Sequence, residues 1–168
     1  ALAHYLFNAL YWASDRWQNA ANPAKVRGEM YHAHPITGSD LAAIQLFTEN
    51  HVEITYLVTL AGWETIGPIS KVYGTDGWAE WSQTGPTVFH FNDGTEETVK
   101  HDGQPEHHEG FRNAMRYLRG VDDELNCPVA MTRPFTVALN AGFQSSGRPT
   151  QIPHELITRE PRDGDVFT

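Results

Sequence analysis

Cysteine is almost absent from this sequence, and other features that would mark a class of protein are absent too. Cys127 is the only cysteine in 168 residues, so neither a disulfide within the chain nor a cysteine-based zinc site can form. No apolar run approaches the ~20 residues that a membrane-spanning helix needs. A single thiol fits a reducing compartment, and we expect a cytoplasmic protein without membrane partners.

Positive charge is scarce and scattered. The chain has 12 Lys and Arg against 21 Asp and Glu, which gives a formal net charge of −9. Binding to nucleic acid or to anionic membranes needs clustered basic side chains. The closest set, Arg112, Arg116 and Arg119, lies on one face of a predicted helix and is interpreted as a solvated face. The charge therefore predicts that nucleic acid is not a partner.

Sequence fingerprints of nucleotide binding and of nucleophilic catalysis are missing as well. The chain has no G-x-G-x-x-G, and the GTDG at 74–77 is followed by a predicted strand, so it is a hairpin turn and not a phosphate cradle. Ser145 and Ser146 lie at a predicted helix end without the G-x-S-x-G of a nucleophile elbow. The chain by itself is therefore expected to hold no cofactor.

What the sequence does contain is a series of short alternating segments between helical patterns. Helices are predicted over 1–13, within PEHHEGFRNAMRYLRG up to Gly120, and from about Thr132 to Gly147. Strands are predicted at 26–34, 41–49, 52–61, 67–74, 78–84, 87–92 and 95–100, and RPTQIPHELI is predicted to be an edge strand or a tail.

The junctions between these segments indicate antiparallel pairing. Asp76-Gly77 and Asp93-Gly94 are hairpin signals, and Asn50-His51 is a weaker one because His tolerates a positive φ less well than Gly. Parallel strands would need long crossovers instead. The expected fold class is α+β, with an open, mainly antiparallel sheet of six or seven strands, helices packed on one face, and one domain over residues 1–168.

Aromatic residues gather in the second half of the predicted sheet. Those expected to cover one of its faces are Trp63, Trp78, Trp81, Phe89 and Phe91. A sheet face of this kind needs covering, so we expect a homo-oligomer formed through it.

Nine histidines raise the question of a metal site. His32 and His34 fall on one face of a predicted strand, as two ligands of one ion would. Gly38 and Ser39 stand where a third, carboxylate ligand is expected, so a metal site is the weaker interpretation. The stronger one is a pair of polar residues that line a cleft or face solvent.

His4 lies in the first turn of the first predicted helix, in ALAHYLFNALYW, where no capping residue precedes it. An imidazole can act as a general acid or base near neutral pH. Position alone favours the alternative, a histidine that simply packs at the helix entrance.

The order of the elements, with several stretches of sequence, resembles a known family. The stretches are KVYGTDGWAEW, GFRNAMRYLRG, GSDLAAIQLFTEN and CPVAMTRPFTVALNAGFQSSGRPTQIP. They are similar to the C-terminal domain of the glucose–fructose oxidoreductase/inositol dehydrogenase/MocA (Gfo/Idh/MocA) family, from His4 to about Pro153. The resemblance implies a dihydrodipicolinate-reductase-like C-terminal domain, which binds substrate and builds the oligomer.

The same resemblance implies an activity and a site. Members are two-domain oxidoreductases that act with NAD or NADP on sugars, cyclitols and related polyols, and their Rossmann domain supplies the nucleotide site and a Glu-Lys-Pro lysine. His4 matches the family's catalytic histidine at the domain junction, whose acidic partner is expected immediately before Ala1. Asn8, one turn on, is expected to bind a substrate hydroxyl, and His32 and His34 to line the same cleft.

Three hypotheses follow. The leading one is a substrate-binding and assembly domain of an oxidoreductase, inactive without its nucleotide-binding half, which is expected to lie outside this chain. The second is a stand-alone, non-catalytic binding or oligomerisation module. The third, a histidine-based metal enzyme, has the least support.

Overall fold

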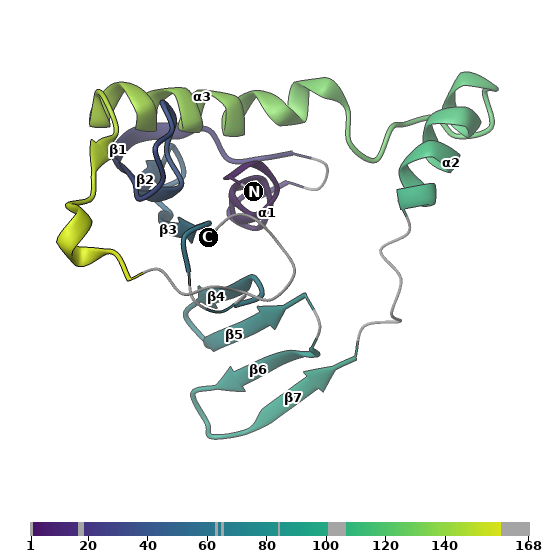
Figure 1. Ribbon diagram of the computed structural model, residues 1–168. Coiled ribbons are helices and arrows are strands. Elements are labelled where there is room, and N and C mark those ends of the chain that lie inside the picture. The colour runs from purple at the N-terminus through teal and green to yellow at the C-terminus, as the bar shows by residue number, and fades with distance from the viewer. Residues whose placement is uncertain are drawn as a thin grey trace. The chain divides into compact units, whose positions relative to one another are not determined.

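The computed structural model of the chain describes residues 2–16, 19–62, 64, 66–83, 85–100 and 107–158. Its helices are α1 (Leu2–Trp12), α2 (His107–Leu118) and α3 (Val129–Ser146), and a short 3-10 turn follows at His154–Leu156 (Figure 1). Its strands are β1 (Pro23–His32), β2 (Leu41–Thr48), β3 (Glu53–Thr59), β4 (Ile69–Tyr73), β5 (Gly77–Ser82), β6 (Thr87–Phe91), β7 (Glu96–Val99) and β8 (Thr150–Gln151). None of the helices in these ranges is long and apolar enough to cross a membrane.

The strands form two sheets of four strands each. The first has the order β3-β2-β1-β8 and the second β4-β5-β6-β7. The first sheet, with α1 and α3, belongs to a compact unit of residues 1–64 and 127–168, and the second to a unit of residues 65–126. The α+β class is confirmed, but the single sheet of six or seven strands is not. Gly62 and Gly67-Pro68 interrupt the strand pattern between β3 and β4, and these two strands belong to different sheets.

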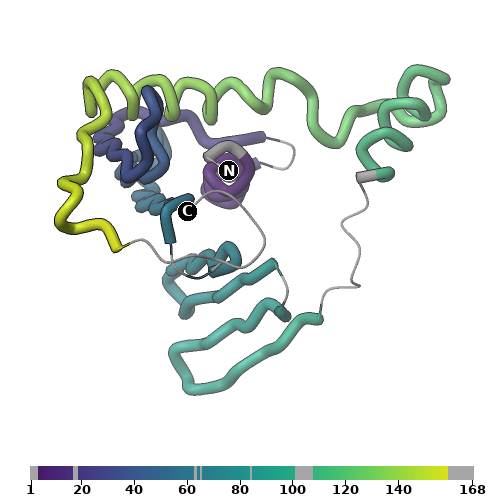
Figure 2. The backbone as a smooth tube through the Cα atoms, viewed as in Figure 1, coloured from purple at the N-terminus to yellow at the C-terminus, as the bar shows by residue number. Residues whose placement is uncertain are grey.

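One face of the first sheet carries the core of its unit. Alternate residues of β2, namely Ala42, Ile44 and Leu46, are buried, as period-two patterning requires. Leu6 and Leu10 of α1 pack against them from the same side as α3. In Figure 2, the backbone of this unit is drawn in purple and blue for its first segment and in green and yellow for its second. The burial of Leu6 and Leu10 thereby decides which side of α1 faces away from the core.

A close approach of backbones joins α3 to β1. A Cβ atom at Gly28 would lie 2.4 Å from the carbonyl oxygen of Gly142 and 2.7 Å from its Cα. The amides of Gly28 and Met30 donate hydrogen bonds to the hydroxyls of Ser145 (3.1 Å) and Ser146 (2.9 Å). These serines, which the sequence had already excluded as nucleophiles, therefore satisfy backbone groups of β1.

Helix α3 begins earlier than the sequence predicted. It starts at Val129, and Pro134 lies inside it and not in its first turn. Thr132 is not its cap, because its hydroxyl donates to the carbonyl oxygen of Val129 at 2.7 Å. Pro134 has no amide to donate to the carbonyl oxygen four residues earlier, so α3 lacks one intrahelical hydrogen bond there, and Pro134 itself is buried.

The three hairpin turns lie where the sequence predicted them. His51 adopts a φ of 67° between β2 and β3, and it is the one non-glycine residue with positive φ in the described part of the chain. Gly77 and Gly94, at the two Asp-Gly junctions, also have positive φ. All three junctions connect antiparallel neighbours, as predicted.

The two faces of the second sheet differ in chemistry. Tyr73, Trp78 and His90 lie directly opposite one another on β4, β5 and β6, and the rings of Trp78 and His90 stack at 3.9 Å between centroids. The same register places Val72, Ala79 and Phe89 on the other face. Trp78 therefore does not share a face with Trp81 and Phe89, contrary to the sequence-based expectation, and Trp63 lies outside the described residues.

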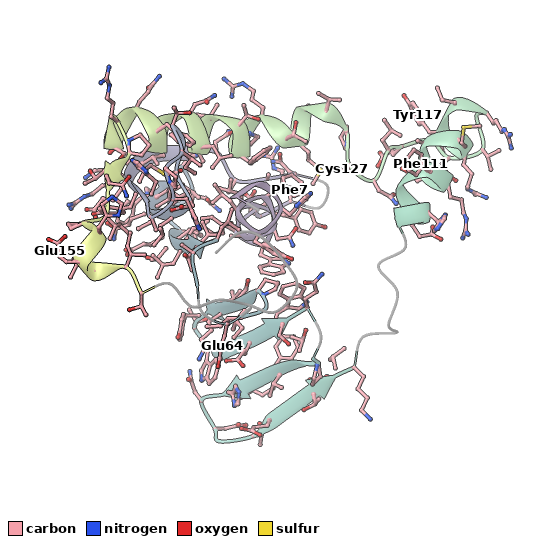
Figure 3. All side chains as sticks on the ribbon, in the orientation of Figure 1. Phe7, Glu64, Phe111, Tyr117, Cys127 and Glu155 are labelled. Carbon is pink, nitrogen blue, oxygen red and sulfur yellow. The ribbon has the colours of Figure 1, made fainter. Side chains whose placement is uncertain are left out.

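Helix α2 carries the apolar stripe that the sequence predicted. Phe111, Met115 and Leu118 recur at i, i+4 and i+7, and all three side chains are exposed. Figure 3 labels Phe111 and Tyr117 on this helix.

Candidate functional site

The polar face of α1 carries the predicted catalytic residue. His4 and Asn8 are four positions apart and differ by about 40° around the helix, whereas His4 and Leu6 differ by about 200°. Leu6 and Leu10 are fully buried, while His4 is exposed and Asn8 is half-buried. His4 and Asn8 therefore share the side of α1 that faces away from the core, where an external ligand can reach both.

The remainder of α1 is held firmly. Phe7 packs edge-on against Phe135 of α3 with ring centroids 6.5 Å apart, and Figure 3 labels Phe7 on its helix. At the C-terminal end, the Asn50 side-chain amide donates to the carbonyl oxygen of Ala13 at 2.7 Å, and the Ala21 amide donates to that of Leu10 at 2.9 Å. These contacts satisfy carbonyl groups that a helix end leaves free.

His32 and His34 are placed differently from the prediction. Strand β1 ends at His32, so His34 lies in the loop that follows and not on the strand. The Nδ1 of His32 donates to the carbonyl oxygen of His34 at 2.9 Å. The strand stops here because Asp40 takes up the amides of Ala33 and His34 and because Pro35, which follows His34, has no amide to donate.

Asp40 organises this loop, and sequence reasoning did not single it out. Its carboxylate accepts hydrogen bonds from the amide of Ala33 (2.9 Å), the amide of His34 (3.0 Å) and the Nδ1 of His34 (2.5 Å). The residue is only 5% exposed. The available signal was a Ser-Asp pair directly before an apolar strand, a place where Asp side chains commonly bond nearby amides.

The electrostatics of Asp40 favour its ionised form. Burial acts to raise the pKa of this carboxyl, but the hydrogen bonds from the His34 and Ala33 amides and from the His34 ring outweigh burial, so the pKa lies below its ordinary value. At neutral pH, Asp40 is therefore a carboxylate and can only accept hydrogen bonds.

The four predicted site residues lie in two places: His4 and Asn8 on α1, and His32 and His34 at the end of β1 and in the loop after it. Within the described ranges, no hydrogen bond or ion pair links His4 or Asn8 to His32 or His34. In the same ranges no three His, Cys, Asp or Glu residues are grouped closely enough to hold a metal ion, so His32 and His34 do not gain a third ligand there.

A shallow depression also lies along β1, and it does not contain the predicted site. It has a volume of about 250 Å³. Its lining includes Arg27, Glu29 and Tyr31, and these groups are occupied with one another: Arg27 and the Tyr31 hydroxyl donate to the Glu29 carboxylate at 3.2 and 3.0 Å. The neighbouring carboxylate raises the pKa of Tyr31 through that hydrogen bond. We assign no chemistry to this depression.

No family model matches the sequence, and neither does any curated protein. Solved structures do match. UDP-N-acetylglucosamine 3-dehydrogenase GnnA from Acidithiobacillus ferrooxidans matches with a TM-score of 0.65 and 15% identity, over 75% of this chain and 41% of that one. The aldose-aldose oxidoreductase from Caulobacter crescentus, complexed with glycerol, matches with a TM-score of 0.60 and 13% identity, over 84% of this chain and 43% of that one.

A third match is the WlbA dehydrogenase from Bordetella pertussis, in complex with NADH and UDP-GlcNAcA. It has a TM-score of 0.54 and 16% identity, and covers 85% of this chain and 41% of that one. The chain thus spans less than half the length of these structures. The chain has the fold of a domain of Gfo/Idh/MocA-type oxidoreductases, and the resemblance seen in the sequence is confirmed at the level of the fold.

Proposed function

We propose that this chain is the substrate-binding and assembly domain, expected to be C-terminal, of an NAD(P)-dependent oxidoreductase that acts on a sugar, a cyclitol or a related polyol. The observation that carries the proposal is the fold match to dehydrogenases and oxidoreductases of sugars over 75–85% of this chain. The polar face of α1 supports it, because His4 and Asn8 lie together on the accessible side of a firmly held helix.

In this proposal each residue has a distinct role. His4 takes the proton of the substrate hydroxyl that is oxidised, and an acidic side chain preceding Ala1 orients its imidazole. Asn8 binds a neighbouring hydroxyl, since its amide can both donate and accept. His32 and His34 contact the same ligand from the end of β1. Because the chain has no G-x-G-x-x-G, we expect the dinucleotide to be bound elsewhere in the enzyme.

The cofactor belongs to the other half of the proposed enzyme. NAD or NADP, bound by a Rossmann domain outside this chain, would accept the hydride from the substrate carbon. The protein's contribution here is to hold that carbon and its hydroxyl in place, and the chain alone is expected to be inactive.

The reading frame upstream of Ala1 provides the test. We expect it to encode a G-x-G-x-x-G and a Glu-Lys-Pro, and the protein that includes both should reduce NAD+ or NADP+ with one or more members of a panel of sugar nucleotides, inositols and polyols. His4→Ala in that protein should lower kcat by about 10²–10⁴-fold, as loss of a general base does. His154→Ala, at an exposed histidine of the 3-10 turn, is the matched control and should leave kcat unchanged.

The alternative is a stand-alone, non-catalytic binding or oligomerisation module. It is favoured by the lack of any nucleotide-binding fingerprint in the chain. An initiator codon within a few residues upstream of Ala1 would support this alternative and contradict the oxidoreductase.

A further inference from the structure

The His34 ring rests on a buried carboxylate. Its Nδ1 lies 2.5 Å from an Oδ2 atom of Asp40, whose side chain is 4% exposed, while the His34 side chain is 24% exposed. Asp40 is itself fixed by the amides of Ala33 and His34, at 2.9 and 3.0 Å. The position of the Asp40 carboxylate is therefore fixed by the backbone, and the hydrogen bond to it sets the orientation of the His34 ring.

This contact decides which nitrogen of His34 carries the proton. An ionised carboxylate only accepts hydrogen bonds, so the proton of the neutral imidazole must be on Nδ1. The lone pair is then on Nε2, on the side of the ring away from Asp40. No described residue makes a hydrogen bond with Nε2. The ring thus offers an oriented acceptor that the described residues leave unused.

We propose that Asp40 and His34 form a carboxylate–imidazole dyad in which Asp40 positions the ring and Nε2 accepts a hydrogen bond from a hydroxyl group of the bound substrate. Asp40 is a positioning residue, since it acts only through His34. The identification of the ligand as a polyol or sugar rests on the proposed function; the dyad itself rests on the geometry alone.

The chemistry of the dyad selects its ligand. An acceptor nitrogen needs a donor, and hydroxyl groups are the donors that sugars and polyols carry in number. A ligand carboxylate has no proton to offer near neutral pH, and the negative charge of Asp40 repels a carboxylate or a phosphate alike. The dyad therefore favours a neutral hydroxyl over an anionic group at this position.

The first measurement is the tautomer of His34 in the nitrogen-labelled chain, from two-bond proton–nitrogen correlation spectra. The wild-type ring should carry its proton on Nδ1. Asp40→Asn removes the negative charge that holds the proton on Nδ1, so a larger share of His34 rings should carry the proton on Nε2. His32, whose Nδ1 donates to a backbone carbonyl oxygen, should keep its tautomer in both proteins.

Asp93→Asn is the matched control, because Asp93 also accepts from a nearby amide, that of Thr95, but lies in the other unit. It should leave the His34 ring unchanged. A wild-type ring with its proton on Nε2 would overturn the dyad, and this outcome does not depend on whether Asp40→Asn folds.

The second measurement adds glycerol, sorbitol or myo-inositol to the same labelled chain. The Nε2 resonance of His34 should move in the direction of hydrogen-bond acceptance, and the movement should be smaller in Asp40→Asn. Movement of the backbone resonances of α1 alone would assign ligand binding to the His4 face and overturn the role of His34. A confirmed tautomer together with a reading frame that lacks a nucleotide-binding domain would reject the oxidoreductase but keep the dyad.

Discussion

At the scale of single residues, Asp40 and Gly28 show how much depends on a few atoms. Asp40 supports the loop after β1 through the amides of Ala33 and His34. Gly28 allows α3 to lie directly on β1. Neither residue stands out in the sequence, because a single Asp or Gly in a strand-rich region has many ordinary explanations. Their roles depend on which groups the fold brings to them.

Replacing Asp40 with Asn should destabilise the chain in a pH-dependent manner. The folded-state pKa of Asp40 is lowered, so the stabilisation is complete above the unfolded pKa of about 3.9 and is lost as pH falls through the folded-state value. Urea unfolding at pH 7 should show a loss of about 1–3 kcal/mol, as for removal of a buried hydrogen-bond partner. The loss should shrink in acid, where Asp40 is also neutral; a difference that stays constant down to pH 2 would contradict this account.

Replacing Gly28 with Ala should cost about 1–3 kcal/mol, because the new Cβ would lie 2.4 Å from the Gly142 carbonyl oxygen and backbone would have to move. Gly38→Ala is the matched control, since nothing lies within 4 Å of a Cβ there. Denaturant unfolding of both variants measures the effect. Equal stabilities would show that α3 can move away from β1 freely.

At the scale of elements, local signals were sufficient for most of the chain. The Asp-Gly pairs and Asn50-His51 predicted the hairpins, and alternating residues predicted β1 to β7 within a few positions. Errors arose where packing competes with local preference. Pro134 would normally mark a helix start, yet α3 extends before it, and Met131 and Pro134 of this part of the helix are buried. His34 leaves the strand because a side chain, Asp40, takes the place of a strand partner.

The β2–β3 turn offers a stabilising substitution. His51 has a φ of 67°, a conformation that costs a non-glycine residue roughly 1–2 kcal/mol. Glycine avoids this cost, but its greater conformational freedom in the unfolded chain offsets part of the gain. His51→Gly should therefore raise the free energy of unfolding by about 0.5–1 kcal/mol, measured in urea. His51→Ala, which keeps the Cβ, should bring no such gain.

At the scale of the whole molecule, the proposal that the chain assembles through a sheet concerns the face of the second sheet that carries Val72, Phe89 and Val99. Val72 and Val99 are 44% and 43% exposed, which is high for apolar strand residues. A partner that covers this face would bury them, at roughly 25 cal/mol per Å² of apolar surface. Association through it is expected to strengthen with concentration.

Neighbouring residues of β7 supply the test of this assembly. Val99 shares its face with Phe89, whereas Thr98 points to the opposite side of the strand. Light scattering should give an oligomer for the wild-type chain, a lower mass for Val99→Lys and an unchanged mass for Thr98→Lys. A monomeric wild type at high concentration, or equal effects of the two lysines, would reject this face as the interface.

The sequence by itself determined the hairpins, the alternation of the strands, the stripe of α2 and the spacing that puts His4 and Asn8 on one side of α1. Each of these depends on residues close together in the chain, where periodicity and turn preferences act. The tertiary structure alone decided the division into two four-stranded sheets, the contact of Gly28 with Gly142 and the orientation of His34 by Asp40. These depend on groups that meet only when the backbone is folded, and no local preference encodes such a meeting.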